Sequence, residues 1–386
     1  GFQKFIVPKE NAKEAGYIRG VKVYAAASLR EVTEHLSGLV PLEPVPPSEF
    51  SARNNAAEKE CDLSFVKGQP VAKRALEVAV AGGHNILFVG PPGSGKTMLA
   101  RAIPSILPDM TFEEALEITK IHSVAGILGG EGIVMKRPFR TPHHTASAVS
   151  LCGGGTRTAH PGEISLAHGG VLFLDELPEY HRDVLEVMRQ PLEDGVVTVS
   201  RAAGTAVYPS RFMLVCAMNP CKCGYFGHPT KACTCTPQSR RNYISMLSGP
   251  ILDRIDIQIE VNALEFSELD TTVAAEPSAK IRERVCKARE FAMSRFDGEL
   301  LPNGQALTCN ARMLPKHIRK YCVFDDGGRE ILQSAYEKLG LSARGYDRIL
   351  KVARTIADFD ESELIRKQHI ALAVQLRSLD RKHFNS

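Results

Sequence analysis

The chain carries the run Gly90-Pro91-Pro92-Gly93-Ser94-Gly95-Lys96-Thr97, which matches the pattern G-x-x-x-x-G-K-[S/T] of phosphate-binding loops. An apolar run of strand type precedes it at residues 86–89, and residues 98–103 predict a helix that Pro104 limits. In such a unit, glycines let backbone N–H groups converge on phosphate oxygens, Lys96 adds a positive charge, and the Thr97 hydroxyl ligates Mg²⁺. The same letters arise by chance in glycine-rich turns, but the flanking strand and helix favour a site for ATP and Mg²⁺.

A second strand ends in two acids. Residues 171–174 are the apolar run Val-Leu-Phe-Leu, and Asp175 and Glu176 follow directly. In a triphosphatase we expect Asp175 to hold Mg²⁺ through water and Glu176 to polarise the attacking water as a general base. The alternative is that the two acids only begin the next helix, which Pro178 also marks. Their pairing with Lys96 favours the catalytic interpretation.

A third apolar run, residues 213–217, ends in Met218-Asn219-Pro220. An amide at the tip of a strand beside the other two is suited to orient the water against the γ-phosphate, so Asn219 is a candidate catalytic residue. Alone, an Asn before a proline is more typical of a turn. The position at a strand end is what supports the assignment.

The three apolar runs predict an α/β fold, a P-loop NTPase core with a parallel sheet and helices on both faces. Beyond Ser278 the spacing becomes helical, which predicts an all-helical lid domain with helices at residues 279–296, 311–321, 329–339, 343–359 and 362–379. Near the amino terminus a strand is expected at residues 20–25 and a helix at 28–35. Four prolines in residues 41–47 predict an extended spacer.

The composition limits the class of protein. The 386 residues are 44% hydrophobic and 24% charged, which excludes a fibre or a wholly disordered chain. No run approaches the ~18 apolar residues of a membrane span, and the first residues lack a signal peptide's hydrophobic stretch, so we expect a cytoplasmic protein without a membrane partner. The net charge of +4 is too small to indicate nucleic acid by itself. Because the chain begins Gly-Phe without Met, we expect further sequence upstream in the natural protein.

Ten cysteines in a chain expected to be cytoplasmic indicate free thiols or a metal rather than disulfides. Four of them, separated as C-x-C, nine residues, C-x-C, are Cys221, Cys223, Cys233 and Cys235. Four thiolates on one short loop suit a structural, tetrahedral Zn²⁺, with His228 as an alternative to one sulfur. The other interpretation is a reduced, metal-free loop, which would have little else to hold it. The remaining six cysteines are scattered and are predicted to be packing thiols.

Several longer strings resemble one family. They are Arg137-Pro138-Phe139-Arg140-Thr141-Pro142-His143-His144-Thr145-Ala146-Ser147, Pro161-Gly162-Glu163-Ile164-Ser165-Leu166-Ala167-His168-Gly169-Gly170 and Gly249-Pro250-Ile251-Leu252-Asp253-Arg254-Ile255-Asp256. With the Walker-type strands and the helical tail, they resemble the AAA+ ATPases and, within these, the magnesium-chelatase-like YifB/ComM family over residues 62–377. The resemblance implies a homo-oligomeric ring, usually hexameric, and for ComM-like members ATP-driven branch migration on single-stranded or branched DNA in natural transformation.

The resemblance also assigns roles to two arginines. Arg254 matches the family's arginine finger, which reaches a neighbouring subunit's γ-phosphate and stabilises transition-state charge. On spacing alone, an ion pair with Asp253 or Asp256 of the same chain has equal weight. Ser342-Ala343-Arg344-Gly345 resembles the lid's sensor motif. That resemblance implies that Arg344 contacts the nucleotide of its own chain, with Arg348 one turn on as the substitute.

By the same resemblance, the chain divides into three parts: residues 1–47, a remnant of an amino-terminal Lon-protease-like domain with a proline-rich linker; residues 48–265, the AAA+ core; and residues 266–386, the helical lid. Inside the core we expect a helix-two insertion at about residues 122–165, a pore hairpin at 195–208 and the cysteine-rich loop at 219–237. Arg201 at the hairpin tip is the candidate DNA contact. An arginine that only solvates an ordinary hairpin has about equal weight.

Two functions of different class follow. The favoured one is a ring-forming ATPase motor on DNA, a ComM-like branch migration helicase. The alternative is a magnesium-chelatase-type remodelling ATPase that acts on a protein partner. Arg201 and the cysteine loop favour the motor, and Asp175 with Glu176 disfavours a nucleotide-binding scaffold without turnover.

Overall fold

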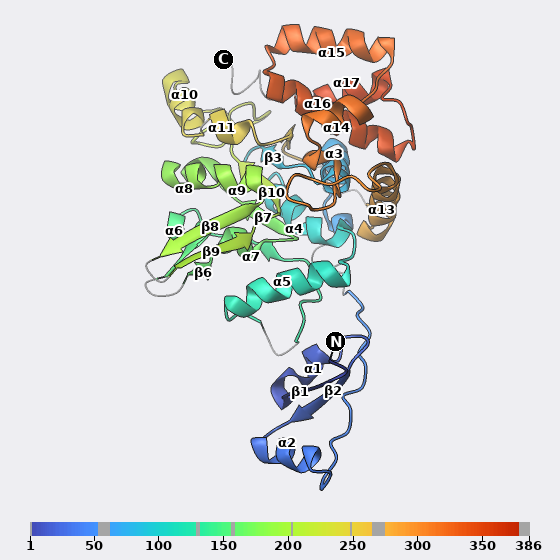
Figure 1. Ribbon diagram of the computed structural model, residues 1–386. Coiled ribbons are helices and arrows are strands. Elements are labelled where there is room, and N and C mark those ends of the chain that lie inside the picture. The colour runs from blue at the N-terminus through green and yellow to red at the C-terminus, as the bar shows by residue number, and fades with distance from the viewer. Residues whose placement is uncertain are drawn as a thin grey trace. The chain divides into compact units, whose positions relative to one another are not determined.

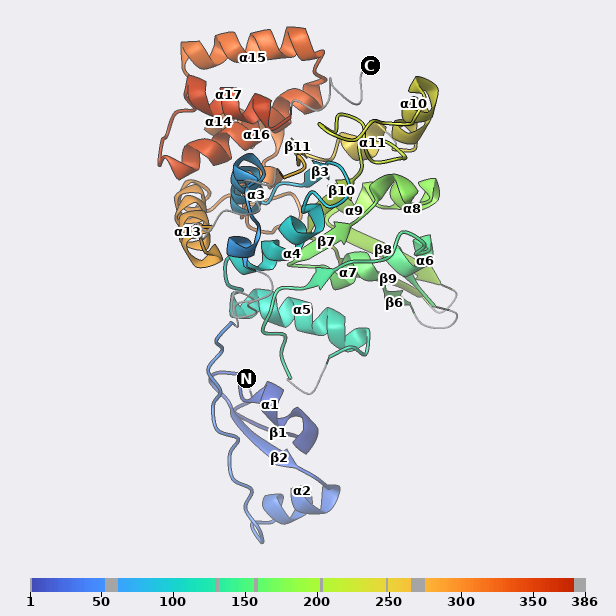
Figure 2. The ribbon, with the colours of Figure 1, turned by 180° about the vertical axis from the view of Figure 1, so that it is seen from behind.

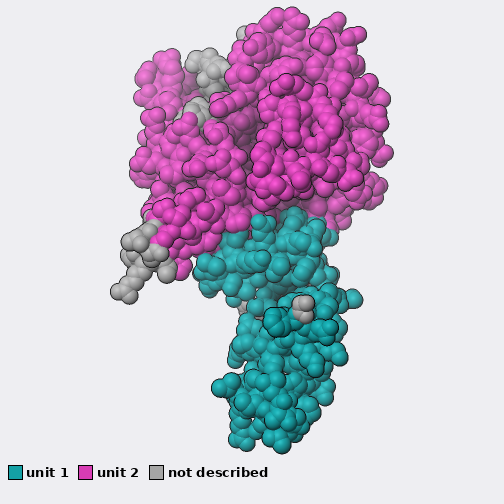
Figure 3. Space-filling model, in the orientation of Figure 1, with its two compact units in different colours: residues 1–53, 109–137 teal, residues 54–108, 138–386 magenta. Residues whose placement is uncertain are grey.

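A computed structural model describes residues 2–52, 62–128, 132–155, 159–201, 204–247, 249–264 and 275–377. The chain forms two compact units, one of residues 1–53 and 109–137, the other of residues 54–108 and 138–386 (Figure 3). All the candidate catalytic and metal-binding residues belong to the second, larger unit. The domain boundaries expected from the sequence stay a prediction, because a compact unit and a family domain need not coincide.

The larger unit is built on a five-stranded sheet in which every neighbouring pair is parallel (Figure 1). Its order is β11 (Ile257–Glu260), β3 (Ile86–Val89), β10 (Met213–Met218), β7 (Val171–Leu174) and β4 (Phe139–Arg140). The three apolar runs of the sequence are thus the three central strands. Because parallel strands end at the same edge of a sheet, the residues that follow these three strands lie close together.

Helices cover both faces of this sheet, as strands with no polar face require. Side chains alternate along β3, so that Ile86 and Phe88 enter one core while Leu87 and Val89 enter the other. The first core is closed by α3 (Pro70–Gly82), α4 (Lys96–Ile106) and α13 (Ser278–Arg295). The second is closed by shorter helices, visible in Figure 1 and from behind in Figure 2: α6 (Ala148–Cys152), α7 (Glu163–Leu166), α8 (Arg182–Val187), α10 (Pro237–Ser245) and α11 (Gly249–Leu252). The expected fold class is confirmed.

The regular elements after α13 are helices throughout the described residues, as expected for a lid. They are a 3₁₀ helix (Asn310–Arg312) and the α-helices α14 (Pro315–Tyr321), α15 (Asp326–Leu339), α16 (Ala343–Phe359) and α17 (Lys367–Gln375). The hydroxyl of Ser342 caps α16 by accepting a hydrogen bond from the Gly345 N–H at 3.1 Å. The helix expected from residue 311 begins only at Pro315. Proline is favoured at the first helical position and disfavours helical geometry in the residue before it, so the expected start was wrong.

A buried ionic cluster joins α13 to α16. The side chain of Arg354 is 0% exposed and that of Asp358 1% exposed, with Nε and Oδ1 3.1 Å apart. Arg295 also bonds Asp358, and Asn310 donates to its Oδ2 at 2.6 Å. The guanidinium of Arg354 further donates to the backbone oxygen of Ser362. The buried carboxylate is therefore surrounded by donors on three segments of the lid.

The smaller unit has a core of its own, formed by Met110, Ala115, Ile118 and Ile133. Its elements are β1 (Lys4–Pro8), paired in parallel with β2 (Lys22–Ala26), and α1 (Ala12–Ala15), α2 (Leu29–Leu36) and α5 (Phe112–Val124). The strand and the helix expected at residues 20–25 and 28–35 are confirmed as β2 and α2. Within the described ranges, no helix of either unit is both long and apolar enough to cross a membrane.

An antiparallel hairpin lies where the sequence predicts one. β8 (Val196–Arg201) pairs with β9 (Gly204–Pro209), and Arg201 stands opposite Gly204 in the register. α9 (Arg189–Asp194) leads into it. The side chain of Arg201 falls outside the described part of the chain, so its contact with DNA stays a prediction, as does the place of the hairpin at a pore.

Candidate active site

The phosphate-binding loop connects the end of β3 to the start of α4. A Cβ atom on Gly90 would lie 2.1 Å from the carbonyl oxygen of Val261, so only glycine lets the loop leave the sheet beside β11. Gly95, the N-cap of α4, has φ +92°, in the region that favours glycine. The first turn of α4, whose N–H groups have no partner within the helix, therefore opens onto the loop.

Lys96 is nearly buried at 8% exposure in this loop. Its Nζ donates to the carbonyl oxygens of Gly90 and Pro91, each at 2.8 Å, and to Oδ1 of Asn219 at 3.3 Å. Burial lowers the pKa of the ammonium group to about 8, against two nearby carboxylates that raise it. The structure thus brings the side chains of the predicted Lys96 and Asn219 together. None of these three hydrogen-bond partners of the Lys96 ammonium group is a carboxylate.

Thr97 and Asp175, the two residues assigned to Mg²⁺, are in direct contact. Oδ2 of Asp175 accepts a hydrogen bond from the Thr97 hydroxyl at 2.9 Å, and its Oδ1 accepts from the Glu176 N–H at 2.9 Å. Hydroxyl and carboxylate oxygens are the ligand types that Mg²⁺ prefers. The pair therefore fits the metal expected with ATP.

Ser94 supplies independent evidence that the loop takes a ligand. Its side chain is buried at 1% exposure, and its Oγ has no hydrogen-bond partner among the described residues. A buried hydroxyl without a partner costs free energy, which a ligand oxygen would recover. With the charge of Lys96 and the open start of α4, the residues present fit the phosphates of ATP.

Glu176 projects from the same edge of the sheet. It has φ +52° and begins the short 3₁₀ helix Leu177–Glu179, and its side chain is 54% exposed. Its Oε2 lies 3.5 Å from Nδ1 of His144, whose ring contacts that of His143 with centroids 4.1 Å apart and planes tilted by 34°. No role is predicted for His144 from the sequence. The available signal is its position shortly after residues 139–140, which form β4, a strand paired in parallel with β7, the strand that precedes Asp175 and Glu176.

The four clustered cysteines converge as predicted. The Sγ atoms of Cys221, Cys223, Cys233 and Cys235 all lie within 4.8 Å of one another. Among Cys221, Cys223 and Cys233 the Sγ–Sγ separations are 3.4, 3.5 and 3.6 Å. Sulfurs at ~2.3 Å from a tetrahedral Zn²⁺ are about 3.8 Å apart, so the cluster fits zinc after small adjustments.

Backbone groups support this cluster, and His228 is engaged elsewhere. Sγ of Cys235 accepts from the Cys223 N–H at 3.4 Å. A backbone hydrogen bond from Tyr225, the largest of several such effects, lowers the pKa of Cys223 to about 5. Nδ1 of His228 accepts from the Thr230 N–H at 3.1 Å. The geometry therefore favours four sulfur ligands over three sulfurs and the imidazole.

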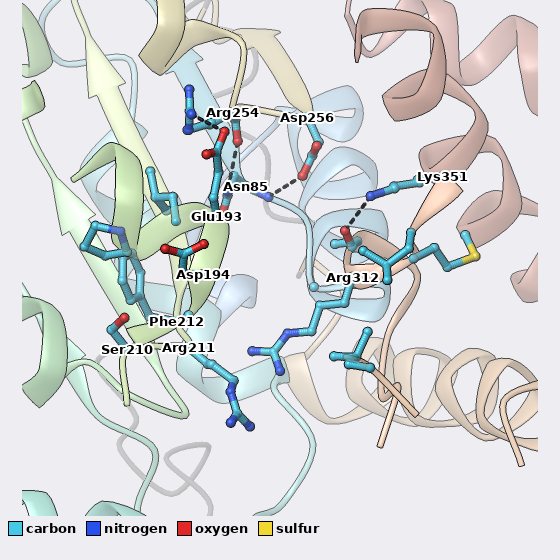
Figure 4. Close-up of a pocket in the computed structure, with 18 of the residues that line it drawn as sticks. Asn85, Glu193, Asp194, Ser210, Arg211, Phe212, Arg254, Asp256, Arg312 and Lys351 are labelled. Carbon is cyan, nitrogen blue, oxygen red and sulfur yellow. Dashed lines mark hydrogen bonds and ion pairs between the residues drawn. The ribbon is translucent and has the colours of Figure 1, made fainter. Parts of the chain in front are cut away.

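Arg254 and Arg344 lie together at the opposite edge of the sheet. They line a cavity of about 580 Å³, shown in Figure 4, which also includes Gly83 and Asn85 just before β3. The P-loop follows β3, whose 4 residues span about 13 Å. The expected contact of Arg344 to its own nucleotide stays a prediction, but Arg344 lies at the edge of the sheet opposite the P-loop of its own chain. The reason is that α16, which carries Arg344, packs against α3, the helix that leads into the amino end of β3.

The acid bound to Arg254 is Glu193, at the end of α9 (Figure 4). Of the two acids weighed from the sequence, Asp253 and Asp256, the second accepts a hydrogen bond from Arg348 through Oδ1 at 2.8 Å. Burial alone would raise the pKa of Asp256, but the positive charges around it, Arg348 foremost, hold its pKa below the usual range. Arg348, the substitute for Arg344, is thus committed to an ion pair within the lid and core of its own chain.

The cavity carries an excess of positive charge. Its lining includes six cationic side chains, Arg211, Arg254, Arg312, Arg344, Arg348 and Lys351, against four acidic ones, Glu193, Asp194, Asp256 and Asp347. Burial lowers the pKa of Arg254, and the neighbouring charge of Arg344 acts in the same direction. Such an environment favours an anionic group from outside the chain.

Comparisons with known proteins identify the family of the chain. The family model of magnesium chelatase, subunit ChlI, matches residues 62–269, and the model of that subunit's C-terminal part matches residues 275–377. The chain is 42% identical over 381 residues to the uncharacterized protein YifB of Escherichia coli, and 43% identical over 383 residues to the competence protein ComM of Haemophilus influenzae. Each match covers 98% of this chain and 72% of the relative. The magnesium-chelatase 67 kDa subunit of Chlorobaculum parvum is 28% identical over 161 residues, 40% of this chain and 23% of that subunit.

Proposed function

The chain belongs to the magnesium-chelatase-like YifB/ComM family of AAA+ ATPases, and from this premise we propose that it is an ATP-hydrolysing ring motor that acts on DNA. The observation that carries the proposal is the contact set at the carboxyl edge of the sheet. There Lys96 meets Asn219, and Thr97 meets Asp175. These are the groups that phosphoryl transfer needs around a γ-phosphate and its metal.

The chemistry assigned to these residues is hydrolysis of ATP. When bound, Mg²⁺ would be held by Thr97 and Asp175 and would neutralise charge on the phosphates. Lys96 binds the γ-phosphate, Asn219 orients the water, and Glu176 accepts its proton. The exposure of the Glu176 side chain leaves its carboxylate accessible to such a water.

We assign Arg254 and Arg344 to the ATP of a neighbouring copy. A chain that carries its P-loop at one edge of the sheet and this arginine pair at the other cannot bring the two together itself. Copies joined edge to edge would place the arginines against the neighbour's γ-phosphate, where a guanidinium stabilises the transition state. The net positive cavity supports this use.

DNA is favoured as the substrate over a protein partner. The competence protein ComM is similar over 98% of this chain, whereas the magnesium-chelatase 67 kDa subunit is similar over 40%. The test is ATP turnover by the purified chain without nucleic acid, with single-stranded DNA and with forked DNA, at low salt. Stimulation by DNA supports the motor. No stimulation together with no retention of DNA would favour the remodelling ATPase.

We further propose one structural Zn²⁺ at the four cysteines, because their sulfurs have the spacing of a tetrahedral site. Four protein ligands leave no open position, so the metal would hold the loop and take no part in hydrolysis. Elemental analysis of protein prepared without chelator should find about one zinc per chain, absent from a Cys221→Ser, Cys233→Ser double variant. A metal-free wild-type chain would favour the reduced loop.

A further inference from the structure

The cysteine loop continues directly from the strand that carries Asn219. Only Pro220 separates Asn219 from Cys221, and Cys221 is buried at 0% exposure. The amide of Asn219 accepts from Lys96. The first cysteine is thus anchored two residues from a group that contacts the phosphate-binding lysine.

The same loop also lies against the P-loop itself. Gly224 has φ +84°, and a Cβ atom there would lie 2.6 Å from Cδ and 2.8 Å from Cγ of Pro92. It would also lie 3.9 Å from Cγ of Asn219. The backbone of Gly224 therefore packs directly on the ring of Pro92 in the P-loop and lies close to the side-chain amide of Asn219.

The loop has little regular structure to hold it in this position. No helix or strand occurs in residues 219–236 of the described chain. Its backbone hydrogen bonds are local, such as Gly224 to Cys221 at 2.9 Å and His228 to Tyr225 at 3.1 Å. A metal that links residues 221 and 223 to residues 233 and 235 would therefore supply the main long-range constraint.

We propose that the four-cysteine loop is a wall of the nucleotide site, and that Zn²⁺ bound there positions Pro92 and Asn219, so that zinc and ATP bind cooperatively. This inference rests on the proposed ATP and zinc sites. Gly224 is its contact point, because only a residue without a side chain allows the loop to touch Pro92. Coupling of two binding sites is reciprocal, so a zinc site that favours nucleotide must itself be tightened by nucleotide.

The first experiment compares two glycines of the loop. Gly224→Ala introduces a Cβ against Pro92, whereas Gly227→Ala introduces one at φ +78° with nothing within 4 Å. Both variants bear the same kind of backbone strain and keep all four cysteines, so both should retain about one zinc by elemental analysis. We expect Gly224→Ala to bind a fluorescent ATP analogue about tenfold more weakly than the wild type, and Gly227→Ala within about twofold. Equal affinities of the two variants would overturn the proposal.

The second experiment uses the unmodified chain and does not depend on a variant that folds. Zinc is titrated to equilibrium between the chain and a coloured chelator, with and without a nonhydrolysable ATP analogue. We expect a lower dissociation constant for zinc with the analogue, since binding of each ligand stabilises the site of the other. Identical zinc affinities in a chain that binds the analogue overturn the coupling alone. Failure of the wild type to bind any nucleotide would instead overturn the proposed ATPase.

Discussion

Glu193 holds the guanidinium of Arg254 at the wall of the cationic cavity, with the side chain of Arg254 9% exposed and that of Glu193 52% exposed. Glu193 lies at the end of α9, immediately before the hairpin of β8 and β9. The ion pair thus joins the segment that carries the hairpin to the residue proposed to serve a neighbour's ATP. Because the Glu193 carboxylate is half exposed, we expect the ion pair to contribute little to stability. Its main effect is to orient the guanidinium of Arg254.

Removal of Arg254 should therefore affect turnover much more than binding. Arg254→Ala should lower kcat by about 10³-fold or more, because it removes the transition-state charge, while the affinity for a fluorescent ATP analogue stays near that of the wild type. Glu193→Gln leaves the arginine but loosens its orientation, and should lower kcat by about two- to tenfold. Glu186→Gln, which breaks an ion pair between Glu186 of α8 and Arg189 of α9, is the control and should be nearly neutral. A Glu193→Gln enzyme at full rate would remove the positioning role.

Mixed assemblies decide whether Arg344 serves its own or a neighbouring site. Arg344→Ala and Glu176→Gln are each expected to hydrolyse poorly. If Arg344 acts on a neighbour, some mixed interfaces contain an intact Glu176 and an intact Arg344, so mixing should restore part of the turnover. If it acted within its own chain, no subunit would hold both groups. Mass analysis must show that mixed assemblies form. No recovery in such assemblies would return Arg344 to its own chain's site.

The general base can be tested by a change that keeps size and shape. Glu176→Gln should bind ATP normally and lower kcat by about 10²-fold or more. Glu179→Gln, three residues on and also exposed, is the matched control and should keep its activity. Rates from a phosphate-release assay, with binding measured separately, check both. Near-normal hydrolysis by Glu176→Gln would place the base elsewhere.

Nucleotide affinity should depend on pH through Lys96. Burial lowers the pKa of this ammonium to about 8 in the chain without nucleotide, and only the protonated form attracts the γ-phosphate. Affinity should thus be constant below about pH 8 and fall by up to about tenfold per unit above it, until the raised pKa of the bound state is reached. Lys96→Arg stays charged throughout, so its weaker binding should be flat over the same range. Equal slopes for the two proteins would contradict this assignment.

The lid should depend on its buried carboxylate. Asp358→Asn leaves Arg354 and Arg295 without a counter-charge, and should lower the free energy of unfolding by about 3 kcal/mol or more. Glu283→Gln removes an exposed partner of Lys287 and should leave the free energy of unfolding nearly unchanged. Urea titrations followed by circular dichroism would measure both. A stable Asp358→Asn chain would show that the cluster relaxes or takes up water.

The sequence predicts those features of the site that depend on residues close together along the chain. The P-loop, the acids after residues 171–174 and Asn219 are each tied to an apolar strand, and parallel strands bring their ends together without further information. The cysteine spacing likewise predicts the convergence of four sulfurs. Such patterns locate the ends of elements less well. The helical spacing predicts a helix from residue 311, but α14 begins at Pro315.

The cationic cavity could not be predicted in this way. Glu193 and Arg254 are separated by 61 positions, and Arg348 and Asp256 by 92. Which acid pairs with which arginine is decided by the packing of α9 and α16, and not by spacing along the chain. For the same reason, the motif around Arg344 identified its residue type but not the edge of the sheet on which it lies.

The backbone at Glu176 has a consequence for how this position responds to selection. A residue other than glycine at φ +52° is strained, at a cost of about 1–3 kcal/mol. Glycine at this position, or asparagine to a smaller degree, should relieve that cost while removing the proposed base. The most stable variants of the chain at position 176 are therefore expected to be the least active, and screens for thermostability would select against hydrolysis here.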